Sequence, residues 1–153
     1  MADEQYEYFL VYARTYKMLR TLGGPKGLAL NLTTGDFEPD TKYITQIMFA
    51  TTQEIFSLDE EEFIRETEEA RKHFLSGDGP IFALYEVVDG IYAQARAEGR
   101  RITPDEIALI DGIFKRTFKM WDEEFARRRA GEPGANTYTS KAIESSSPSG
   151  GEA

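Results

Sequence analysis

The longest helical pattern in the chain reads TPDEIALIDGIFKRTFKMWDEEFARRR over residues 103–129. Thr103 and Glu106 have the spacing of a capping box, and Pro104 stands at the first helical position, where its missing N–H leaves no bond unmade. Gly131 and then Pro133 end the pattern. Its apolar residues form one stripe and spread onto a second side: Ile107, Ile110, Phe114, Phe118, Trp121 and Phe125, then Leu109, Ile113 and Met120. So broad an apolar face predicts a helix that packs against several others.

The same three- and four-residue spacing recurs upstream of this helix, which predicts further helices over residues 4–22, 41–56, 58–76 and 80–99. Gly23-Gly24-Pro25 and Gly77-Asp78-Gly79-Pro80 separate these segments, and Ser57-Leu58-Asp59-Glu60 has the pattern of a capping box. Short connections favour antiparallel neighbours. The sequence therefore predicts an all-α fold, a single-domain up-and-down bundle of about five helices over residues 1–130.

The segment 58–76 has a narrower apolar stripe than the other predicted helices. The stripe consists of Phe63, Thr67, Ala70 and Phe74, and the remaining sides are acidic, with Glu60, Glu61, Glu62, Glu66, Glu68 and Glu69. Such a helix is expected at the edge of the bundle, with its carboxylates in solvent.

Two parts of the chain depart from the helical spacing. Residues 26–39 include an alternation of Leu28, Leu30 and Leu32 with smaller side chains, which predicts a short extended arm that packs on the helices or waits at an edge for a partner. Residues 131–153 hold few apolar side chains and the run Ser145-Ser146-Ser147-Pro148, so we expect a disordered C-terminal tail.

One short pattern occurs twice. Residues 88–92 (VDGIY) and 110–114 (IDGIF) share an apolar-Asp-Gly-Ile-aromatic order. Asp-Gly between apolar runs can mark a β-hairpin, but both runs keep helical spacing for several turns, which favours helices. A glycine inside a helix costs about 1 kcal/mol relative to alanine. Gly90 and Gly112 are then either tolerated on an outer face or kept for close approach by a neighbouring helix, chain or ligand.

Composition excludes several kinds of chemistry. The 153 residues contain no cysteine, so disulfides, iron–sulfur clusters and thiolate zinc sites are excluded. The formal charge of −9 disfavours nucleic acid and anionic membrane surfaces as partners. No apolar run reaches the length of a membrane span, and the first residues are acidic rather than those of a secretory signal, so we expect a cytoplasmic location. The hydrophobic share of 41% is enough for one folded core.

Candidate catalytic and metal-binding groups are few. His73 is the only imidazole, and we expect it to be a structural or surface residue. The paired Glu-x-x-His motifs of a di-metal bundle are missing, and Asp36-Phe37-Glu38-Pro39-Asp40 lacks the glycine and final glutamate of a calcium loop. The sequence accordingly predicts no metal and no cofactor.

Surplus apolar surface points to a non-enzymatic protein–protein interaction module, such as an adaptor, an assembly factor, an inhibitor or a small subunit. Its partner would be another protein, either a second copy or a different chain. The candidate contacts lie on the first predicted helix (Tyr8, Val11, Met18 and Leu22) and on the last (Leu109, Ile113 and Met120).

The alternative is a small helical enzyme or enzyme subunit. It would use carboxylate and tyrosine acid–base chemistry, with Asp111 or Glu86 acting beside Tyr85 or Tyr92. A pocket of several hundred cubic ångströms with convergent polar groups around Asp111 would favour this alternative. An exposed patch of Leu109, Ile113 and Met120 would favour the interaction module.

Overall fold

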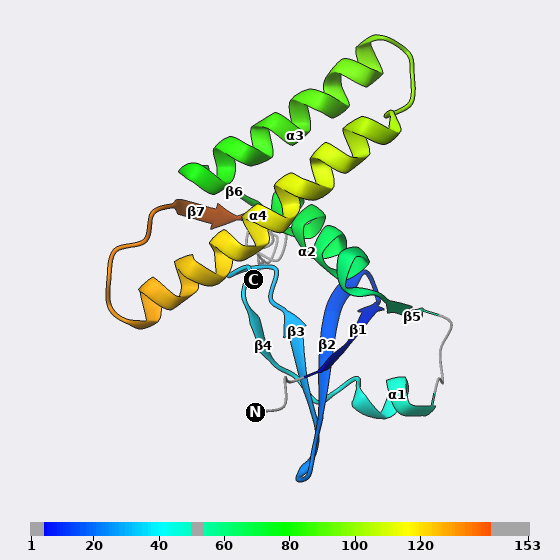
Figure 1. Cartoon of the computed structure of the whole chain (residues 1–153). Helices are drawn as coiled ribbons and strands as arrows, with labels where there is room; N and C mark the ends of the chain where they lie inside the picture. Colours follow the sequence, from blue (N-terminus) through cyan, green and yellow to red (C-terminus); the bar gives the residue numbers. More distant parts are fainter. Residues whose placement is uncertain (1–4, 50–53, 142–153) are drawn as a thin grey trace, which may run out of the picture.

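The protein has an α+β fold, and the all-α prediction is wrong. The computed structural model describes residues 5–49 and 54–141. In chain order the elements are β1 (Tyr6–Val11), β2 (Arg14–Thr21), β3 (Gly24–Leu30), β4 (Phe37–Pro39), α1 (Ile44–Phe49), β5 (Ile55–Leu58), α2 (Glu60–Phe74), β6 (Leu75–Asp78), α3 (Pro80–Ala97), α4 (Pro104–Arg129) and β7 (Thr137–Ser140). The chain therefore builds a sheet first and a helical layer second, as Figure 1 shows.

The main sheet has five antiparallel strands in the order β4-β3-β2-β1-β5. The first four strands follow one another as a meander, and β5 returns to pair with β1, with Val11 opposite Ile55. The segment predicted as an extended arm supplies β3 and β4. Its alternation was interpreted correctly as a strand, but the strand pairs inside the sheet with β2 and β4.

Residues 6–21 form a hairpin where the sequence analysis expected a helix. Tyr12 and Ala13 make its two-residue turn with φ of 50° and 66°, the left-handed conformation that suits a tight hairpin. Strand β1 has apolar residues on both sides, Tyr8 and Leu10 on one and Phe9 and Val11 on the other, so it lacks the polar–apolar alternation of a half-exposed strand. In β2 the alternation is confined to residues 15–18. Aromatic and apolar residues on both sides imitate the spacing of a broad helical face, which explains the error.

Each face of the sheet packs against a helix. On one face Val11, Tyr16, Met18 and Ala29 form a buried cluster that Ile44 and Ile47 of α1 help to cover. On the other face Phe63 of α2 packs against strand residues, among them Tyr8, at 4.4 Å between ring centroids.

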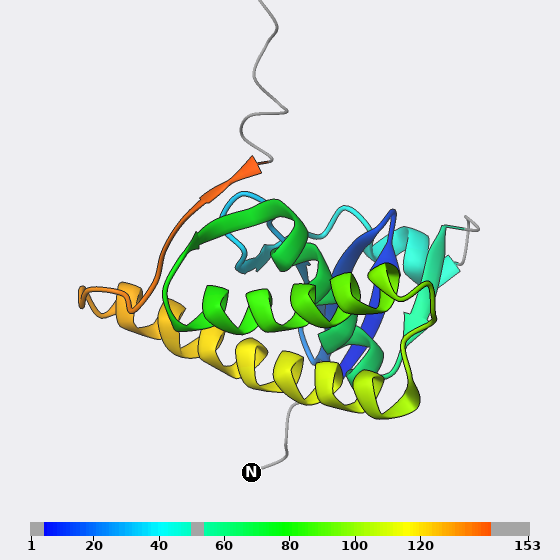
Figure 2. The ribbon, with the colours of Figure 1, turned by 90° about the horizontal axis from the view of Figure 1, so that it is seen from above.

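Helix α2 lies between the sheet and the α3–α4 hairpin, so it is central rather than at the edge (Figures 1 and 2). Its capping box joins Asp59 to Glu62, two residues later than the predicted box of Ser57 and Glu60. The predicted α3 and α4 are confirmed, including the Thr103–Glu106 capping box. Both Asp-Gly pairs lie inside these helices, so the hairpin alternative for them is wrong.

The predicted tail is partly ordered. β7 pairs antiparallel with β6, with Leu75 opposite Ser140. The loop before it is fixed by Glu124 of α4, whose Oε1 accepts bonds from the backbone N–H groups of Ala135 and Asn136 at 2.9 and 3.2 Å. The folded unit therefore continues beyond residue 130, and the rest of the predicted tail, residues 142–153, lies outside the described residues.

Candidate functional site

A charged pair is buried where α2 meets α4 and the loop before β4. The Arg71 Nη1 group donates to Glu68 Oε2 at 2.9 Å, and the two side chains are 1% and 0% exposed. Glu68 Oε1 also accepts from Tyr85 Oη at 2.8 Å and from Thr117 Oγ1. Arg71 Nε donates to the Gly35 carbonyl at 2.8 Å, which ties α2 to the sheet. The prediction that the Glu68 carboxylate lies in solvent is therefore wrong.

Aromatic rings surround the Arg71 guanidinium. Its central carbon lies between 5.4 and 5.8 Å from the ring centroids of Phe37, Phe118, Trp121 and Phe125. Rings at this distance attract a cation, and here they also exclude water. Burial raises the pKa of Glu68, and burial together with the neighbouring Glu68 raises the pKa of Tyr85 well above its usual value. Within the described residues no buried side-chain nitrogen or oxygen lacks a hydrogen-bond partner, and the side chains of Glu68 and Arg71 are closed to solvent. The cluster therefore stabilises the fold and offers no opening for a substrate.

A pocket of about 290 Å³ opens beside Asp111. It is lined by Arg65, Tyr92, Ile102, Ile107, Ile110 and Asp111. Both Asp111 oxygens accept from Arg65, at 2.9 Å each, and Tyr92 Oη donates to Glu69 at 2.8 Å. Burial and the Glu69 carboxylate raise the pKa of Tyr92, which keeps its hydroxyl protonated. The pocket thus combines apolar walls with polar groups that are already bonded to one another.

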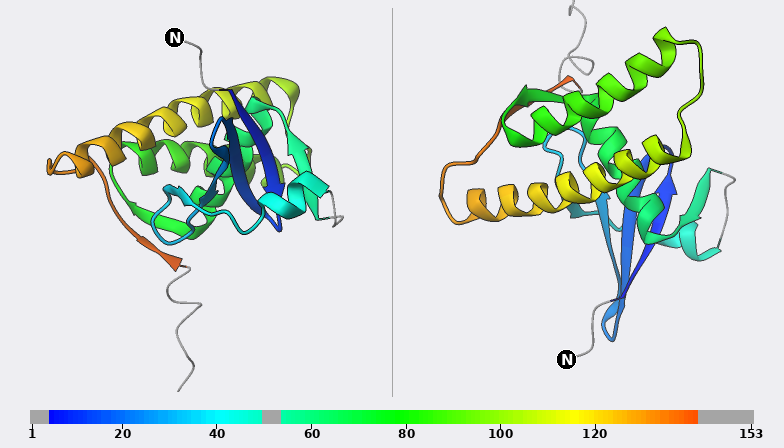
Figure 3. Two further views of the ribbon diagram at one scale, coloured as in Figure 1. Left: turned by 90° about the horizontal axis from the view of Figure 1, so that it is seen from below. Right: turned by 45° about the horizontal axis from the view of Figure 1, so that its top comes forward.

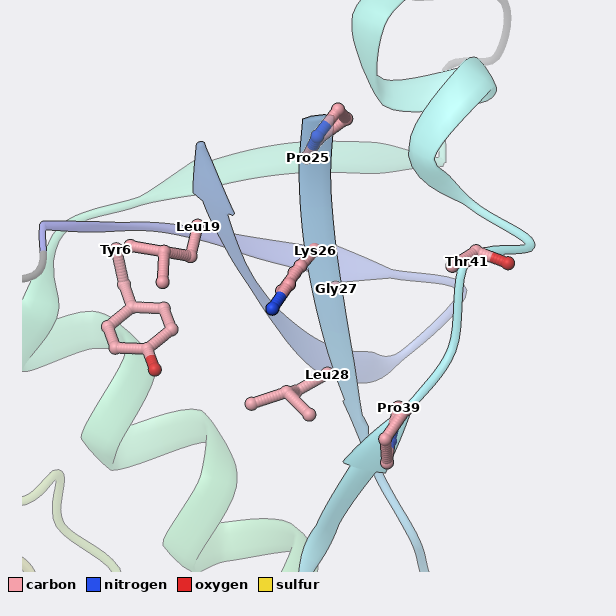
Figure 4. Close-up of a pocket in the computed structure, with 8 residues that line it drawn as sticks. All are labelled: Tyr6, Leu19, Pro25, Lys26, Gly27, Leu28, Pro39 and Thr41. Carbon is pink, nitrogen blue, oxygen red and sulfur yellow. The ribbon is translucent and has the colours of Figure 1, made fainter. Parts of the chain in front are cut away.

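A second pocket, of about 220 Å³, lies at the end of the sheet where β2, β3 and β4 meet (Figure 4). Leu19 and Leu28 are apolar residues of its lining, which also includes Tyr6, Lys26 and Thr41. Pro25, Gly27 and Pro39 complete the wall with backbone and ring atoms. The walls suit an apolar group, but no pair of catalytic side chains converges there.

One exposed apolar surface on the helices is the side of the α3–α4 hairpin that faces away from α2. Tyr85, Asp89 and Tyr92 of α3 bond to α2, so helical spacing turns Val87 to the opposite side. Asp111 and Lys115 of α4 likewise reach α2. Leu109, Ile113 and Met120 therefore share the far side with Val87, and Figure 3, right, shows both helices lying in front of α2.

We call this surface the outer face, defined by Leu84, Val87, Ile91, Leu109, Ile113 and Met120. Val87 and Leu109 are 48% and 54% exposed, and the other four are half-buried. It lies along both helices, which the Phe82–Trp121 and Tyr85–Phe114 ring contacts hold together.

The predicted contact residues fall into two groups. Leu109, Ile113 and Met120 come together on the outer face. Those from the predicted first helix do not form a surface, because Val11 and Met18 are buried in the sheet core, Tyr8 packs on Phe63 and Leu22 is exposed at the β2–β3 turn. The assignment of Val11 and Met18 to a contact surface is therefore corrected.

Other predicted site residues stay apart. Glu86 is exposed on α3, away from Asp111, and Tyr85 is buried, so the proposed acid–base pairings with Tyr85 are not formed. His73 is exposed at the end of α2 beside the Phe74 ring. Within residues 5–49 and 54–141, no three histidine or carboxylate side chains gather as a metal site would require.

Sequence reasoning missed Val87 as a surface residue and the Glu68–Arg71 pair. The three-residue spacing of Glu68 and Arg71 was a usable indication, because such a pair on an otherwise apolar side of α2 can be buried only together. Exposed aromatic residues also lie near α1 and β5, namely Tyr12, Phe49 and Phe56. They escaped notice because this region was assigned to helices.

No described helix combines the length and the apolar character needed to cross a membrane. Comparison with known proteins gives no family: no family model, curated protein or solved structure matches the chain.

Proposed function

We propose that this protein is a non-catalytic interaction module that binds another protein through the outer face of the α3–α4 hairpin. The observation that carries the proposal is the exposure of Val87 and Leu109 on two adjoining, well-packed helices. Apolar side chains held on rigid helices lose little entropy when a partner covers them, so they are suited to binding. The four half-buried neighbours extend the same surface.

The two polar clusters support a binding role over a catalytic one. Glu68 and Tyr85 are sealed in the core, and Asp111 is held by two bonds from Arg65. A general acid or base has to reach the substrate with a free bonding site. Glu68 and Tyr85 do not reach solvent, and Asp111, whose side chain is 27% exposed, has both of its oxygens bonded to Arg65.

Affinity capture with matched variants tests the proposal. Leu109→Asn places an amide on the outer face, while Ile107→Asn makes the same change on the same helix, at a residue of similar exposure, 47%, that lines the Asp111 pocket. We expect Leu109→Asn to lose the captured partner and Ile107→Asn to retain it. Retention by both variants would contradict the proposal. Circular dichroism of each variant checks that the fold is kept.

A small enzyme or ligand-binding protein is the second candidate, favoured by the pocket at Asp111. Its volume suits a small ligand, and Arg65 could exchange Asp111 for an anionic group of that ligand. The same pair of variants separates the candidates, because loss of binding with Ile107→Asn alone would assign the function to the pocket.

The proposal includes a cytoplasmic location. The sequence contains no apolar run long enough for a membrane span, and its net charge is negative. Fractionation of cells that express the tagged protein tests this part.

A further inference from the structure

We propose that a second copy of this chain occupies the outer face and forms a symmetric dimer, in which α3 of each copy lies along α4 of the other. The inference rests on the proposed function, since it names the partner of that same surface. It is carried by the position of two helical glycines and by two charged residues that border the outer face.

Within the described residues, no contact and no backbone angle requires glycine at position 90 or 112. An added Cβ at either residue meets nothing within 4 Å, and neither has a positive φ. Alanine would be more favourable in both helices by about 1 kcal/mol. Close approach by a helix from another chain gives both glycines a role, because backbones can come together where side chains are missing.

The two glycines lie at nearly the same height along the hairpin. From the Phe82–Trp121 ring contact, Gly90 is about 12 Å along α3 and Gly112 about 13.5 Å along α4 in the same direction. With the Tyr85–Phe114 contact as reference the two heights differ by about 4.5 Å, still less than one helical turn. Gly90 lies at the border of the outer face on α3 and Gly112 at its border on α4.

A twofold axis parallel to the hairpin preserves these heights. It sets α3 of one copy over α4 of the other, running in opposite directions, as in an antiparallel four-helix arrangement. Gly90 of each copy then meets Gly112 of the other, and the apolar residues of the two outer faces cover one another. The same closed symmetry uses up the surface, so the assembly stops at two copies.

Charge also matches in this arrangement. Glu86 on α3 and Arg116 on α4 are exposed beside the outer face, and within the described part of the chain neither forms an ion pair. From the Phe82–Trp121 contact their heights are about 6 and about 7.5 Å. The twofold axis brings Glu86 of one copy beside Arg116 of the other, twice in each dimer. Opposite charges at these positions favour this register over others.

Sedimentation and light scattering over a concentration series test the inference. We expect a mass near twice the 17.3 kDa of one chain. Glu86→Arg or Arg116→Glu alone should weaken self-association by about tenfold, and the two changes together should restore most of it. Gly112→Leu should also weaken the dimer by about tenfold or more, because it fills the site of close approach.

A matched control uses Ala126→Leu, the same kind of enlargement on α4. Helical spacing places Ala126 with Lys115, which reaches Glu61 on α2, and so away from the outer face. This variant should keep the dimer, and the open space at Gly112 means that Gly112→Leu should keep the monomer folded. Circular dichroism checks both.

A wild-type chain that stays monomeric overturns the inference, and so does a dimer that responds to none of these substitutions. The proposed function is judged separately, since a monomer that still captures a different protein and loses it with Leu109→Asn keeps the function and removes only the second copy as partner.

Discussion

Asn136 Oδ1 accepts a hydrogen bond from the backbone N–H of Ile81 at 3.0 Å. Gly79, the residue before α3, has no side chain to cap the helix. Asn136, which lies 55 residues after Ile81 in sequence, therefore performs this role from the loop before β7. Its amide nitrogen also donates to Glu124 Oε1 at 2.9 Å, so one side chain joins the start of α3 to the last turns of α4.

Substitution Asn136→Ala should lower the free energy of unfolding by about 2 kcal/mol, because it removes the cap and leaves Glu124 with fewer donors. Urea denaturation gives the measurement. Thr137→Ala, at the exposed neighbouring position, is the control and should change stability little. Equal stability of Asn136→Ala and the wild type would show that solvent replaces the cap.

Arg71→Met should destabilise the protein by about 3–5 kcal/mol, because Glu68 would remain buried without its counter-charge. The double variant Glu68→Leu with Arg71→Met should be more stable than Arg71→Met alone. Chemical denaturation of the three proteins measures this difference. A double variant that is less stable than Arg71→Met would contradict this expectation. It would mean that the hydrogen bonds from Thr117 and Tyr85 to the Glu68 carboxylate contribute more free energy than burial of the unpaired charge costs.

Glu106 should make stability depend on acid pH. Hydrogen bonds from Arg100 and from the Thr103 backbone lower its pKa from 4.5 to about 2. Because the pKa is lower in the folded state, the contribution is complete above pH 4.5 and disappears as the pH falls toward about 2. Thermal unfolding of wild type and Glu106→Gln over this range should show a difference that shrinks with acid. A difference that grows would contradict the assignment.

Alanine at Gly90 or Gly112 should raise the stability of the isolated monomer by about 1 kcal/mol, since the added methyl group meets open space and the helix gains. Denaturation of dilute protein, where association does not contribute, measures the change. Gly77→Ala is the contrast, because its Cβ would lie 2.0 Å from the Thr137 carbonyl oxygen and should destabilise β6–β7. Loss of stability at Gly90 would show that the helix is distorted there.

Helices α3 and α4 could be predicted from the sequence because local chemistry decides them. Pro80, Pro104 and the Thr103–Glu106 pair act within a few residues of where they stand. The β1–β2 hairpin was not predicted, since β1 is apolar on both sides and the turn at Tyr12 and Ala13 lacks the usual Asn-Gly or Asp-Gly. The strand conformation of residues 6–21 depends on packing against α1 and α2, which follow the hairpin in the chain.

The candidate site was predicted only where it lies on those locally determined helices. Leu109, Ile113 and Met120 were found because α4 was assigned correctly, whereas Val11 and Met18 were misplaced with the hairpin. The burial of Glu68 was missed, although its three-residue spacing from Arg71 fits an ion pair on one side of α2. It depends on Arg71, Thr117 and Tyr85 meeting from three helices, and hydrophobic spacing carries no information about such a meeting.

The position of α2 between the sheet and the α3–α4 hairpin has a consequence for synthesis. All five strands of the main sheet leave the ribosome before α2 does, so the nascent sheet has one apolar face uncovered and two free edge strands, β4 and β5. Only when residues 60–74 have emerged can Phe63 and Arg71 close that face. A chain truncated before this point should aggregate rather than accumulate as a folded sheet.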